Sequence, residues 1–477
     1  MPEPAASDFG AKGAPASGPA RAAKPSHQTG SEIGVPPVAI AGCGAITAVG
    51  CGVESLRAAL CNNTSGLRAD ERFNHPRFQS GIVGAVLEIN REGEKNTPTE
   101  ISPVEPSGGL PLVGRVTPCA PPATKLSPGA HGVTHPTMRF MAGEMPTECV
   151  GGEADDPAFQ LAEEALRQAC DSSRKILSTI PPQRLGLVLS TTKANLEALE
   201  RLSDGRPCSA AARRHLQGDL LAADLAAAHG AGGSVQCVSA ACVSGLIAIQ
   251  QGAKLIQRGA ADAVLVVGVD HLSAFVVAGF TALKAIDPIG CRPFDRDRSG
   301  LSPGEAGAAL VLVRADLAPR GSIKITGWGG SNDANLLTGP SRDGAGLVLA
   351  IRGALAMSEL PPSAIDYVNV HGTGTPYNDA MESLALQTIF GAACPPFSGS
   401  KGMLGHTLGA AGVVETILCV LAMQEKILPG TPRLGVAAEG VPASIVREPR
   451  PAAKLNCVLK LNTGFGGLNG ALILQNV

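Results

Sequence analysis

The stretch SAACVSGLIAIQQGAKLIQRGAADAVLVVG, residues 239–268, joins a cysteine-containing turn, a helix and a strand. Apolar residues recur at helical spacing over residues 246–257, and Gly259 follows as a helix stop. Residues 263–268 are continuously apolar, as a strand buried on both faces requires. This succession predicts an α/β fold in which helices cover a buried sheet.

The same alternation extends to both sides of this stretch. In the first part of the chain, strands are expected at 38–42, 185–189 and 308–313, and helices at 52–61 and 158–169. A second series follows Pro319, with strands at 322–326, 367–370, 458–462 and 471–474 and helices at 346–357, 379–390 and 408–424. The similar order of elements suggests two related α/β halves, 36–319 and 320–477.

Two segments depart from this alternation. Residues 1–35 are rich in Ala, Pro, Gly and Ser and show no hydrophobic period, which predicts a disordered tail. Residues 91–156 are dense in Pro, Gly, Thr and Ser, which favours a long surface insertion within the first half. Neither segment has the pattern of a hydrophobic core.

Composition argues against several classes of function. Charged residues make up 17% of the chain, the formal net charge is −2 and no basic tract occurs, so no nucleic-acid partner is expected. The 13 cysteines form no CxxC pair and no cluster at zinc-ligand spacing, so we expect reduced thiols, no metal and a cytoplasmic location. The apolar runs are interrupted before membrane-spanning length, so no membrane span is expected.

Cys242 lies at the start of the predicted helix 246–257. Unpaired N–H groups and the positive end of a helix dipole favour the thiolate, which is the reactive form of cysteine. The small residues Ala240, Ala241 and Gly245 leave room beside it for an acyl chain. The alternative, which suits most of the other cysteines, is a buried structural thiol.

His371 follows the predicted strand 367–370 and begins the loop HGTGTP. A histidine at the carboxyl end of a buried strand points into the crevice where α/β sheets bind ligands. The alternative is a core histidine that bonds to a backbone carbonyl.

His406 lies directly before the predicted helix 408–424, where the helix dipole disfavours imidazolium and helps to keep the ring neutral. Lys401 lies in the glycine-rich turn that leads to His406. We expect a buried acid to hold this lysine, with Glu305 and Glu382 as candidates.

A glycine-rich loop, TGFGG at 463–467, lies between the last two predicted strands. It lacks the GxGxxG spacing and no helix follows it, so dinucleotide binding is not expected. Glycines at this place favour a close approach of the backbone to a substrate carbonyl.

Together these segments resemble the β-ketoacyl-acyl-carrier-protein synthases of the two-histidine branch of the thiolase superfamily. The resemblance covers about 37–90 and 157–477 and depends on the motifs as a set. They are the Cys242 turn, CRPFD at 291–295 with Gly304-Glu305, the loop from His371 to Pro376 with Asp379 and Glu382, the segment from Lys401 to His406, and Gly464-Phe465-Gly466-Gly467.

The resemblance implies a thiolase-like fold, in which two duplicated α/β halves form five layers, αβαβα, and pair as a dimer. It implies that Cys242 accepts an acyl chain and that His371 and His406 bind a malonyl thioester, which loses CO2 and condenses with that chain. Lys401 would organise the site. Phe465, flanked by Gly464 and Gly466, would give an oxyanion-hole N–H and gate acyl access. The implied supporting residues are Glu305, Thr373, Thr375, Asp379 and Glu382.

No free cofactor and no metal are implied, because the substrates arrive on the 4′-phosphopantetheine arm of an acyl carrier protein. The implied partners are this carrier protein and a second synthase subunit, either identical or related.

Departures and alternatives accompany the resemblance. Ala240 and Val243 stand where the family often has Thr and a small residue, which affects the shape of the acyl pocket, and Ala306 stands where Gly is common. A chain-length-factor-like partner subunit would be expected to lack the nucleophile. A thiolase would carry a second cysteine in place of Phe465, and the starter-condensing branch would carry Asn in place of His406. Acyl length, the type of dimer, and the choice among fatty-acid, polyketide and polyene synthesis stay open.

Overall fold

The computed structural model describes residues 37–73, 82–84 and 155–476, which belong to one compact unit. The predicted tail 1–35 lies outside the described residues, as does the predicted insertion 91–156 except for its last two residues. These two, Asp155 and Asp156, are buried. The described fold therefore includes two residues that were assigned to the surface insertion.

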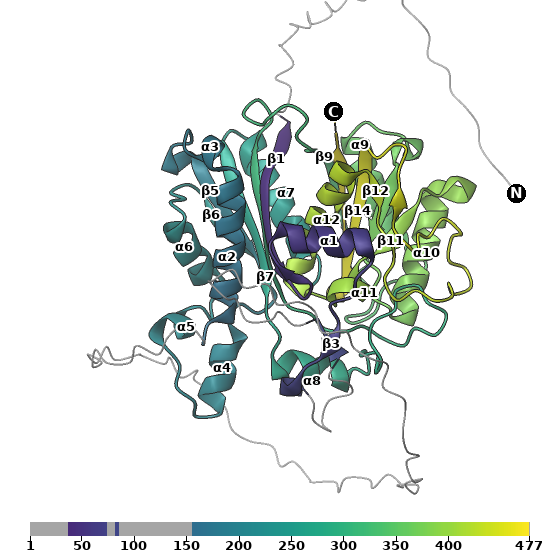
Figure 1. Ribbon diagram of the computed structural model, residues 1–477, viewed down its shortest axis with the longest axis horizontal. Helices are drawn as coiled ribbons and strands as arrows, with labels where there is room; N and C mark the ends of the chain where they lie inside the picture. The colour runs from purple at the N-terminus through teal and green to yellow at the C-terminus, as the bar shows by residue number, and fades with distance from the viewer. Residues whose placement is uncertain (1–36, 74–81, 85–154, 477) are drawn as a thin grey trace, which may run out of the picture. The chain divides into compact units, whose positions relative to one another are not determined.

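Ten strands form two five-stranded halves of one continuous sheet path, and the halves have the same topology (Figure 1). When the five strands of each half are numbered along the chain, they lie side by side in the order 1-5-4-2-3. The pairs among the first three positions are antiparallel, and the pairs among the last three are parallel. The first half consists of β1 (Val38–Thr47), β8 (Ala306–Arg314), β7 (Ala263–Asp270), β5 (Leu185–Ser190) and β6 (Val235–Val238). The second consists of β9 (Lys324–Asn332), β15 (Leu468–Gln475), β14 (Cys457–Gly464), β10 (Tyr367–Val370) and β11 (Phe397–Gly399).

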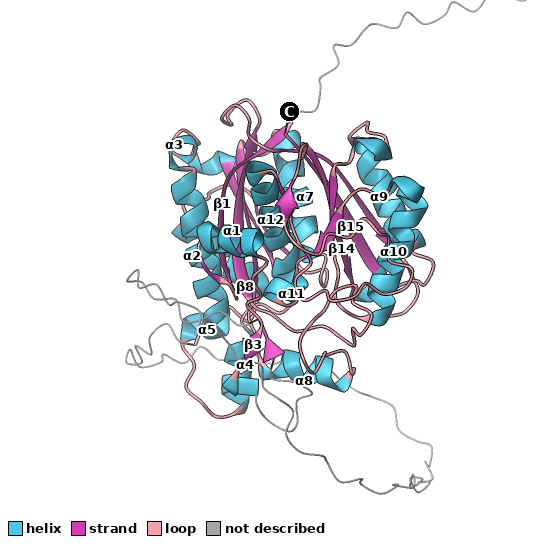
Figure 2. Ribbon diagram, turned by 45° about the vertical axis from the view of Figure 1, so that its right-hand side comes forward, coloured by secondary structure: helices cyan, strands magenta, loops and turns pink. Residues whose placement is uncertain are grey.

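Helices complete a five-layered arrangement (Figure 2). The middle layer contains α7 (Ser244–Gln257) and α12 (Ala411–Glu425), whose apolar residues share one core cluster with both halves of the sheet. The outer layers contain α2 (Pro157–Ser172) and α6 (Gly218–Ala228) on the first half, and α9 (Ala345–Met357) and α10 (Pro376–Phe390) on the second. The predicted αβαβα fold with duplicated halves is therefore confirmed.

The two middle helices approach each other closely at their N-terminal ends. A Cβ atom placed on Gly245 would lie 2.8 Å from the Cα atom of Gly412, so neither position has room for a side chain. Glycine at these positions brings the turn that precedes α7 next to the turn that precedes α12. Cys242 and His406 belong to these two turns.

The sequence Leu408–Glu425, which comprises α12 and the turn before it, is long and apolar enough to cross a membrane by length and composition. Gly409, Gly412 and Glu415 interrupt this stretch, as the sequence analysis expected of the apolar runs. In the fold 89% of the stretch is buried among other elements, which accounts for its apolar sequence.

Every predicted helix and strand within the described residues is present, with shifted ends. β1 continues to Thr47 and β9 to Asn332, and α10 begins at Pro376 because proline suits the first helical position. The sequence analysis missed several elements with little periodicity to reveal them. They are α3 (Arg174–Leu177), α4 (Leu196–Ser203), α5 (Ala210–Arg214), α6, α8 (Ala274–Ala282), α11 (Lys401–Leu404), β6 and β11, and five two-residue strands; α1 is Val53–Asn62.

His215 lies buried between two carboxylates where α2, α5 and α6 meet. Its Nδ1 is 2.5 Å from an oxygen of Asp156 and its Nε2 is 2.9 Å from an oxygen of Asp224. The ring of Phe159 stacks on it with centroids 5.2 Å apart. Burial alone would lower the pKa of His215, but the bonds to both carboxylates outweigh burial and raise this pKa above its usual value.

Replacing His215 with phenylalanine is expected to lower the free energy of unfolding by about 2 kcal/mol at pH 6, less than for a fully buried pair because Asp224 is partly exposed. Since the folded-state pKa is raised, the stabilisation is complete below the unfolded pKa of about 6.5 and is lost as pH rises through the folded pKa. Urea unfolding of both proteins from pH 6 to 9, at one protein concentration, measures this. If the difference in free energy of unfolding between the two proteins did not change with pH, the assigned role of His215 would be contradicted.

Candidate active site

Cys242 lies in a sharp turn between β6 and α7. The preceding residue, Ala241, has a positive φ of 47°, a conformation that costs a non-glycine residue about 1 kcal/mol or more. Ser244 stabilises the turn, because its hydroxyl accepts from the Ala240 N–H at 2.7 Å and donates to the Ala241 carbonyl at 2.6 Å. The thiol-bearing residue lies two positions before the first residue of α7.

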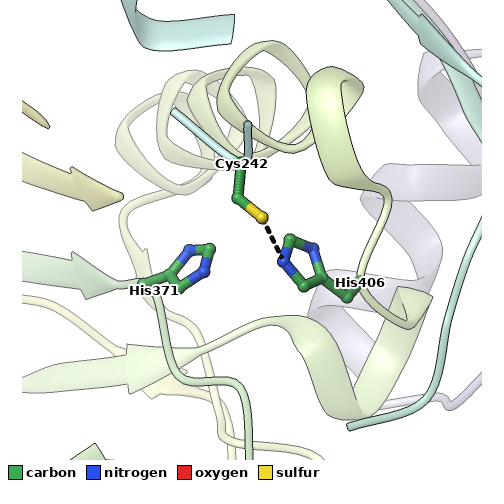
Figure 3. A group of neighbouring side chains, drawn as sticks. All are labelled: Cys242, His371 and His406. Carbon is green, nitrogen blue, oxygen red and sulfur yellow. Dashed lines mark hydrogen bonds between the residues drawn. The ribbon is translucent and has the colours of Figure 1, made fainter. Parts of the chain in front are cut away.

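Cys242, His371 and His406 come together from three different segments (Figure 3). Sγ of Cys242 lies 3.0 Å from Nε2 of His406. The centroids of the two imidazole rings are 5.0 Å apart and their planes are nearly perpendicular, at 81°. One ligand-type atom from each of the three residues lies within 4.8 Å of the others. The thiol and both imidazoles therefore face one small volume.

The hydrogen bonds of His406 determine which ring nitrogen carries the proton. The Leu408 N–H donates to Nδ1 at 3.2 Å, so the proton of the neutral ring lies on Nε2, toward Cys242. Leu408 has a positive φ of 50°, and the next N–H, of Gly409, donates to the buried carboxylate of Asp270 at 2.6 Å. This strained turn directs the Nε2–H of His406 at the thiol.

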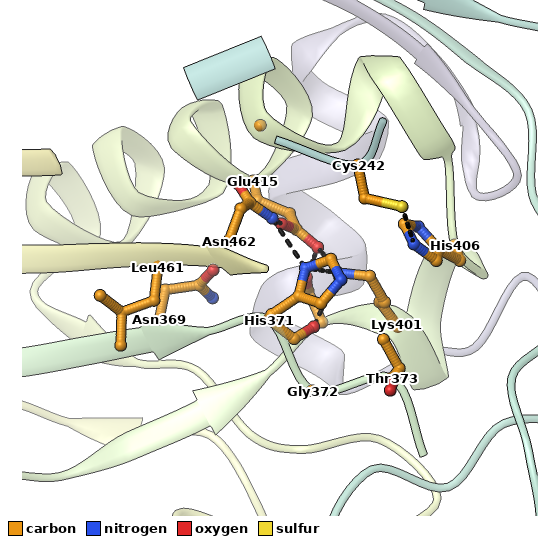
Figure 4. A network of polar contacts seen from close by, with 12 residues as sticks. Cys242, Asn369, His371, Gly372, Thr373, Lys401, His406, Glu415, Leu461 and Asn462 are labelled. Carbon is orange, nitrogen blue, oxygen red and sulfur yellow. Dashed lines mark hydrogen bonds and ion pairs between the residues drawn. The ribbon is translucent and has the colours of Figure 1, made fainter. Parts of the chain in front are cut away.

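His371 has the same tautomer for a similar reason (Figure 4). Nζ of Lys401 lies 3.1 Å from its Nδ1, and Nδ2 of Asn462 lies 2.9 Å from the same atom. Both groups are donors, so Nδ1 accepts and the ring proton lies on Nε2. The alternative of a core histidine bonded through its ring to a backbone carbonyl does not describe this residue.

Both imidazoles are held in the neutral form. Burial, and after it the positive charge of Lys401, lowers the pKa of His371 well below its usual value and the pKa of His406 to about 3. The neutral state of His406 was predicted from the helix dipole, but burial is the larger cause. Each ring can therefore donate one uncharged hydrogen bond into the shared volume.

The three residues are also the types that bind transition metals, so a metal site has to be considered. Coordination through Nε2 would require the ring proton to lie on Nδ1. At His371 that N–H would meet the Lys401 ammonium and the Asn462 amide, and at His406 it would meet the Leu408 N–H. The hydrogen bonds around these rings suit two donors better than two metal ligands.

The predicted thiolate at Cys242 was wrong for the resting protein. Burial raises the pKa of the Cys242 thiol to about 11, although the charge of Lys401 and the N–H of Phe465 act in the opposite direction. Loss of hydration is the largest cause of this raised pKa. The resting group is a thiol whose sulfur already receives hydrogen bonds that would stabilise a thiolate.

Lys401 is bound by a buried acid, but by neither candidate from the sequence. Its Nζ lies 2.6 Å from Oε1 of Glu415 on α12 and donates to the His371 carbonyl at 2.7 Å. Burial would raise the pKa of Glu415, but Lys401 and Lys460 lower it to about 2. Glu305 and Glu382 were wrong predictions for this contact, because both carboxylates are engaged with backbone N–H groups elsewhere.

Glu415, Lys460 and Asn462 were missed by the sequence analysis. All three are buried and linked in one network with Lys401 and His371. A signal was present, since Glu415 and Lys460 are charged residues inside segments otherwise apolar enough to be predicted as a buried helix and strand. A charge at such a position is rarely retained without a buried partner.

Two carboxylates of α10 shape the loop after His371. Glu382 accepts from the N–H groups of His371 at 2.6 Å and Gly372 at 2.7 Å. Asp379 accepts from the N–H groups of Thr373 at 3.1 Å and Gly374 at 3.2 Å. They act on the backbone and fix where the imidazole of His371 lies.

The other predicted supporting residues fall into two groups. The hydroxyls of Thr373 and Thr375 lie 2.8 Å apart, and both residues line the cavity described below. Glu305 is buried, accepts from the Leu272 N–H at 2.9 Å and pairs with Arg72 at 3.3 Å. The structure therefore brings the threonines to the site, whereas Leu272 and Arg72, which bind the Glu305 carboxylate, lie outside it.

A cavity of about 510 Å³ opens onto the thiol and both histidines. Phe465, which follows β14, lines it and lies 6.0 Å from the ring of Phe280, measured between centroids. Gly464 lies against the nucleophile turn, because a Cβ atom on it would be 3.1 Å from the Cys242 nitrogen. The N–H of Phe465 lies near enough to the Cys242 sulfur to lower the pKa of the thiol. Two backbone N–H groups, of Cys242 and Phe465, thus flank the thiol.

Duplicated halves in five layers, with a buried thiol and two neutral donors at the end of a cavity, define a condensing acyltransferase of the thiolase superfamily. The family comparison agrees: "Beta-ketoacyl synthase, N-terminal domain" matches residues 143–318 and "Beta-ketoacyl synthase, C-terminal domain" matches residues 323–434. The chain belongs to the beta-ketoacyl synthase family, whose members form carbon–carbon bonds by acyl transfer.

Similar proteins come from polyketide and fatty-acid synthesis. A Streptomyces halstedii protein described as polyketide beta-ketoacyl synthase 1 is 33% identical over 73% of this chain and 85% of its own length. The 3-oxoacyl-[acyl-carrier-protein] synthase 2 of Coxiella burnetii is 30% identical over 74% of this chain and 93% of its own length. Among solved structures, the ishigamide ketosynthase/chain length factor has a TM-score of 0.74 and 26% identity, and covers 93% of this chain and 99% of that one.

Proposed function

We propose that this beta-ketoacyl synthase works through Cys242, His371 and His406 and extends an acyl chain delivered by a carrier protein. The observation that carries the proposal is the 3.0 Å contact between the Cys242 sulfur and Nε2 of His406, with Nε2–H of His371 facing the same volume. Such an enzyme needs a nucleophile to hold one acyl group and neutral donors to stabilise an enolate from the other.

In the first half-reaction the Cys242 sulfur attacks the carbonyl carbon of an acyl thioester. A carbon–sulfur bond to Cys242 forms, the bond to the pantetheine sulfur breaks, and the thiol proton leaves on that sulfur. His406 does not accept this proton, since its Nε2 already carries one. It donates to the sulfur instead and lowers the cost of forming a thiolate from a thiol with a raised pKa.

The N–H groups of Cys242 and Phe465 are the proposed oxyanion hole of this step. They flank the sulfur, and donors at this place stabilise the negative oxygen of a tetrahedral intermediate. Phe465 contacts Phe280 at the wall of the cavity, so movement of its ring would change access to the thiol. Gly466, whose φ is 80°, gives this loop a backbone conformation that favours glycine, whereas Gly464 leaves room beside the Cys242 turn.

Replacing Gly464 with alanine is expected to lower kcat/KM by about 10- to 100-fold with little loss of stability. The new Cβ atom would press on the Cys242 nitrogen at 3.1 Å and on Val243 at 3.2 Å, while the φ of −155° suits any residue. Steady-state kinetics with thermal melting as a control measures this. If the variant had wild-type kinetics, the Cys242 N–H would not be part of the oxyanion hole.

In the second half-reaction the carbonyl oxygen of a malonyl thioester accepts from Nε2–H of both His371 and His406. The carbon–carbon bond to the carboxylate breaks and CO2 leaves. The electron pair of that bond stays with the malonyl carbon and forms an enolate, which the two donors stabilise. The enolate carbon attacks the acyl carbonyl on Cys242. The new carbon–carbon bond gives a β-ketoacyl thioester, and the Cys242 sulfur leaves as a thiolate that takes a proton from solvent.

The substrates are proposed to arrive on a phosphopantetheine arm through the 510 Å³ cavity. Thr373 and Thr375 line it and offer hydroxyls to the amide groups of such an arm. Lys401 positions His371 and orders the network behind it. We propose that the reaction uses no further organic cofactor and no metal, since every step above has a donor or a nucleophile from the chain.

The second subunit is proposed to pair along β6. Among the described residues, this strand is the edge strand of its half of the sheet, and its residue Val235 is 38% exposed. The strand leads directly to the Cys242 turn, so such pairing would support the nucleophile. Two similar structures, one from Xenorhabdus doucetiae at 26% identity, are named as ketosynthases with a chain length factor. A related rather than an identical partner is therefore proposed.

We favour chain elongation in a polyketide or polyene pathway over housekeeping fatty-acid elongation. Similarity to the two ketosynthase structures with a chain length factor, each at 26% identity over 93% of this chain, supports this choice. The test is product formation from acyl thioesters of two to sixteen carbons with malonyl-carrier protein, with and without candidate partner subunits. Full activity of the isolated protein on ordinary saturated chains would contradict the choice of pathway, and inactivity with every partner would favour a non-catalytic subunit.

A further inference from the structure

A second buried lysine, Lys460, lies behind the two histidines. It belongs to β14, its neighbours in that strand are apolar, and its side chain is 0% exposed. Its Nζ lies 2.8 Å from Oε2 of Glu415 and donates to the Leu461 carbonyl. Burying an ammonium group costs several kcal/mol, and a salt bridge only partly offsets this cost. Packing alone does not explain a lysine at this position.

Both carboxylate oxygens of Glu415 accept hydrogen bonds from groups other than Lys460. Its Oε1 accepts from Lys401 at 2.6 Å and from the Ser400 hydroxyl at 3.2 Å, and its Oε2 accepts from Asn462 at 2.9 Å. One lysine already balances the charge of this carboxylate. Burial lowers the pKa of Lys460 and the charge of Glu415 acts in the opposite direction. In its protonated form Lys460 gives the cluster of Lys401, Lys460 and Glu415 a surplus of one positive charge.

We propose that Lys460 is a positioning residue whose charge keeps His371 and His406 as neutral N–H donors. The inference depends on the donor roles proposed above for these two rings. If His371 gained a proton on Nδ1, that N–H would meet the donors Lys401 and Asn462. A surplus cation nearby makes such protonation more costly, and the charge of Lys460 contributes to the lowered pKa of both histidines.

The groups around Lys460 leave this charge largely uncompensated. Glu415 and Cys419 face it from α12 and Lys401 faces it from α11. Its register partners on the two adjacent strands are Asn369 and Leu472, neither of which ionises. The next acid, Glu382, binds the His371 N–H, and burial followed by the charge of Asp379 raises the pKa of Glu382 to about 7.

The test compares Lys460→Met with Lys460→Arg and with Lys454→Met, a control at a lysine that is 63% exposed and lies outside the site. The first readout is the pH dependence of kcat/KM from pH 8 down to the lowest pH at which each variant stays folded. The second is the protonation and tautomer of the ring nitrogens, followed by NMR on protein with ¹⁵N-labelled histidine and assigned with His371→Gln and His406→Gln. Thermal melting confirms that each variant is folded.

Lys460→Arg and Lys454→Met are expected to lose activity, and to show a protonated ring, at the same low pH as wild type. Lys460→Met is expected to do so at a pH about one unit higher. An unchanged profile with neutral rings in Lys460→Met would overturn the proposal. If that variant does not fold, Lys460→Gln replaces it with the same expectations. The NMR readout needs no turnover, so it separates this proposal from a failure of the proposed function.

Discussion

Cys242→Ala is expected to form no covalent acyl adduct and to condense acyl and malonyl thioesters at least about 10⁴-fold more slowly than wild type. The adduct is lost because the other described cysteines lie outside the group that faces His371 and His406. Slow loss of CO2 from the malonyl thioester is expected to persist, because both imidazole donors remain. The assays are intact-mass spectrometry for the adduct and CO2 release for decarboxylation.

Cys457→Ala is the matched control, since Cys457 is also buried but lies at the start of β14, away from the cavity. It is expected to retain the adduct and the wild-type rate within a few-fold. An adduct on Cys242→Ala would show that another residue is the nucleophile. Complete loss of CO2 release in that variant would argue against separate roles for the thiol and the histidines.

Replacing His371 or His406 with alanine is expected to reduce condensation by about 10²- to 10³-fold each, the usual cost of one donor to a developing oxyanion. Acylation of Cys242 is expected to survive in His371→Ala and to be slowed moderately in His406→Ala, because only His406 contacts the sulfur. Pre-steady-state mass spectrometry separates the two half-reactions.

Glutamine tests whether a neutral donor is what each histidine contributes. Its side-chain amide can place an N–H near the position of Nε2 without a titratable proton, so His406→Gln should retain more activity than His406→Ala. If acylation and condensation fell equally in every variant, the histidines would not have a specific role in the second half-reaction.

Much of the fold could be predicted from the chain because its central strands are continuously apolar and its central helices are long. Runs such as that of β7 are interpretable without tertiary information. The edge strand β6, with only four half-buried or exposed residues, gives no such signal. Short elements such as α11 are formed by contacts far away in the sequence, which a local pattern does not contain.

The site was harder to predict than the fold. Cys242, His371, His406 and Lys401 are brought together, but the sequence analysis used helix ends to assign the charges of Cys242 and His406. In the folded protein burial is the larger effect, and it raises the pKa of Cys242 and lowers that of both histidines. Glu415 was missed as the partner of Lys401 because it lies on α12, whose sequence is otherwise largely apolar.

The central claim is that Cys242 carries the growing chain and that a malonyl thioester removes it by condensation. The most direct measurement follows the mass of wild-type protein, first with an acyl-carrier thioester alone and then after addition of malonyl-carrier protein. We predict one acyl adduct, located at Cys242 by peptide mapping, that disappears as an equal amount of β-ketoacyl product forms. A protein that gives no adduct with any chain length or partner, or an adduct that malonyl-carrier protein does not discharge, would contradict the account.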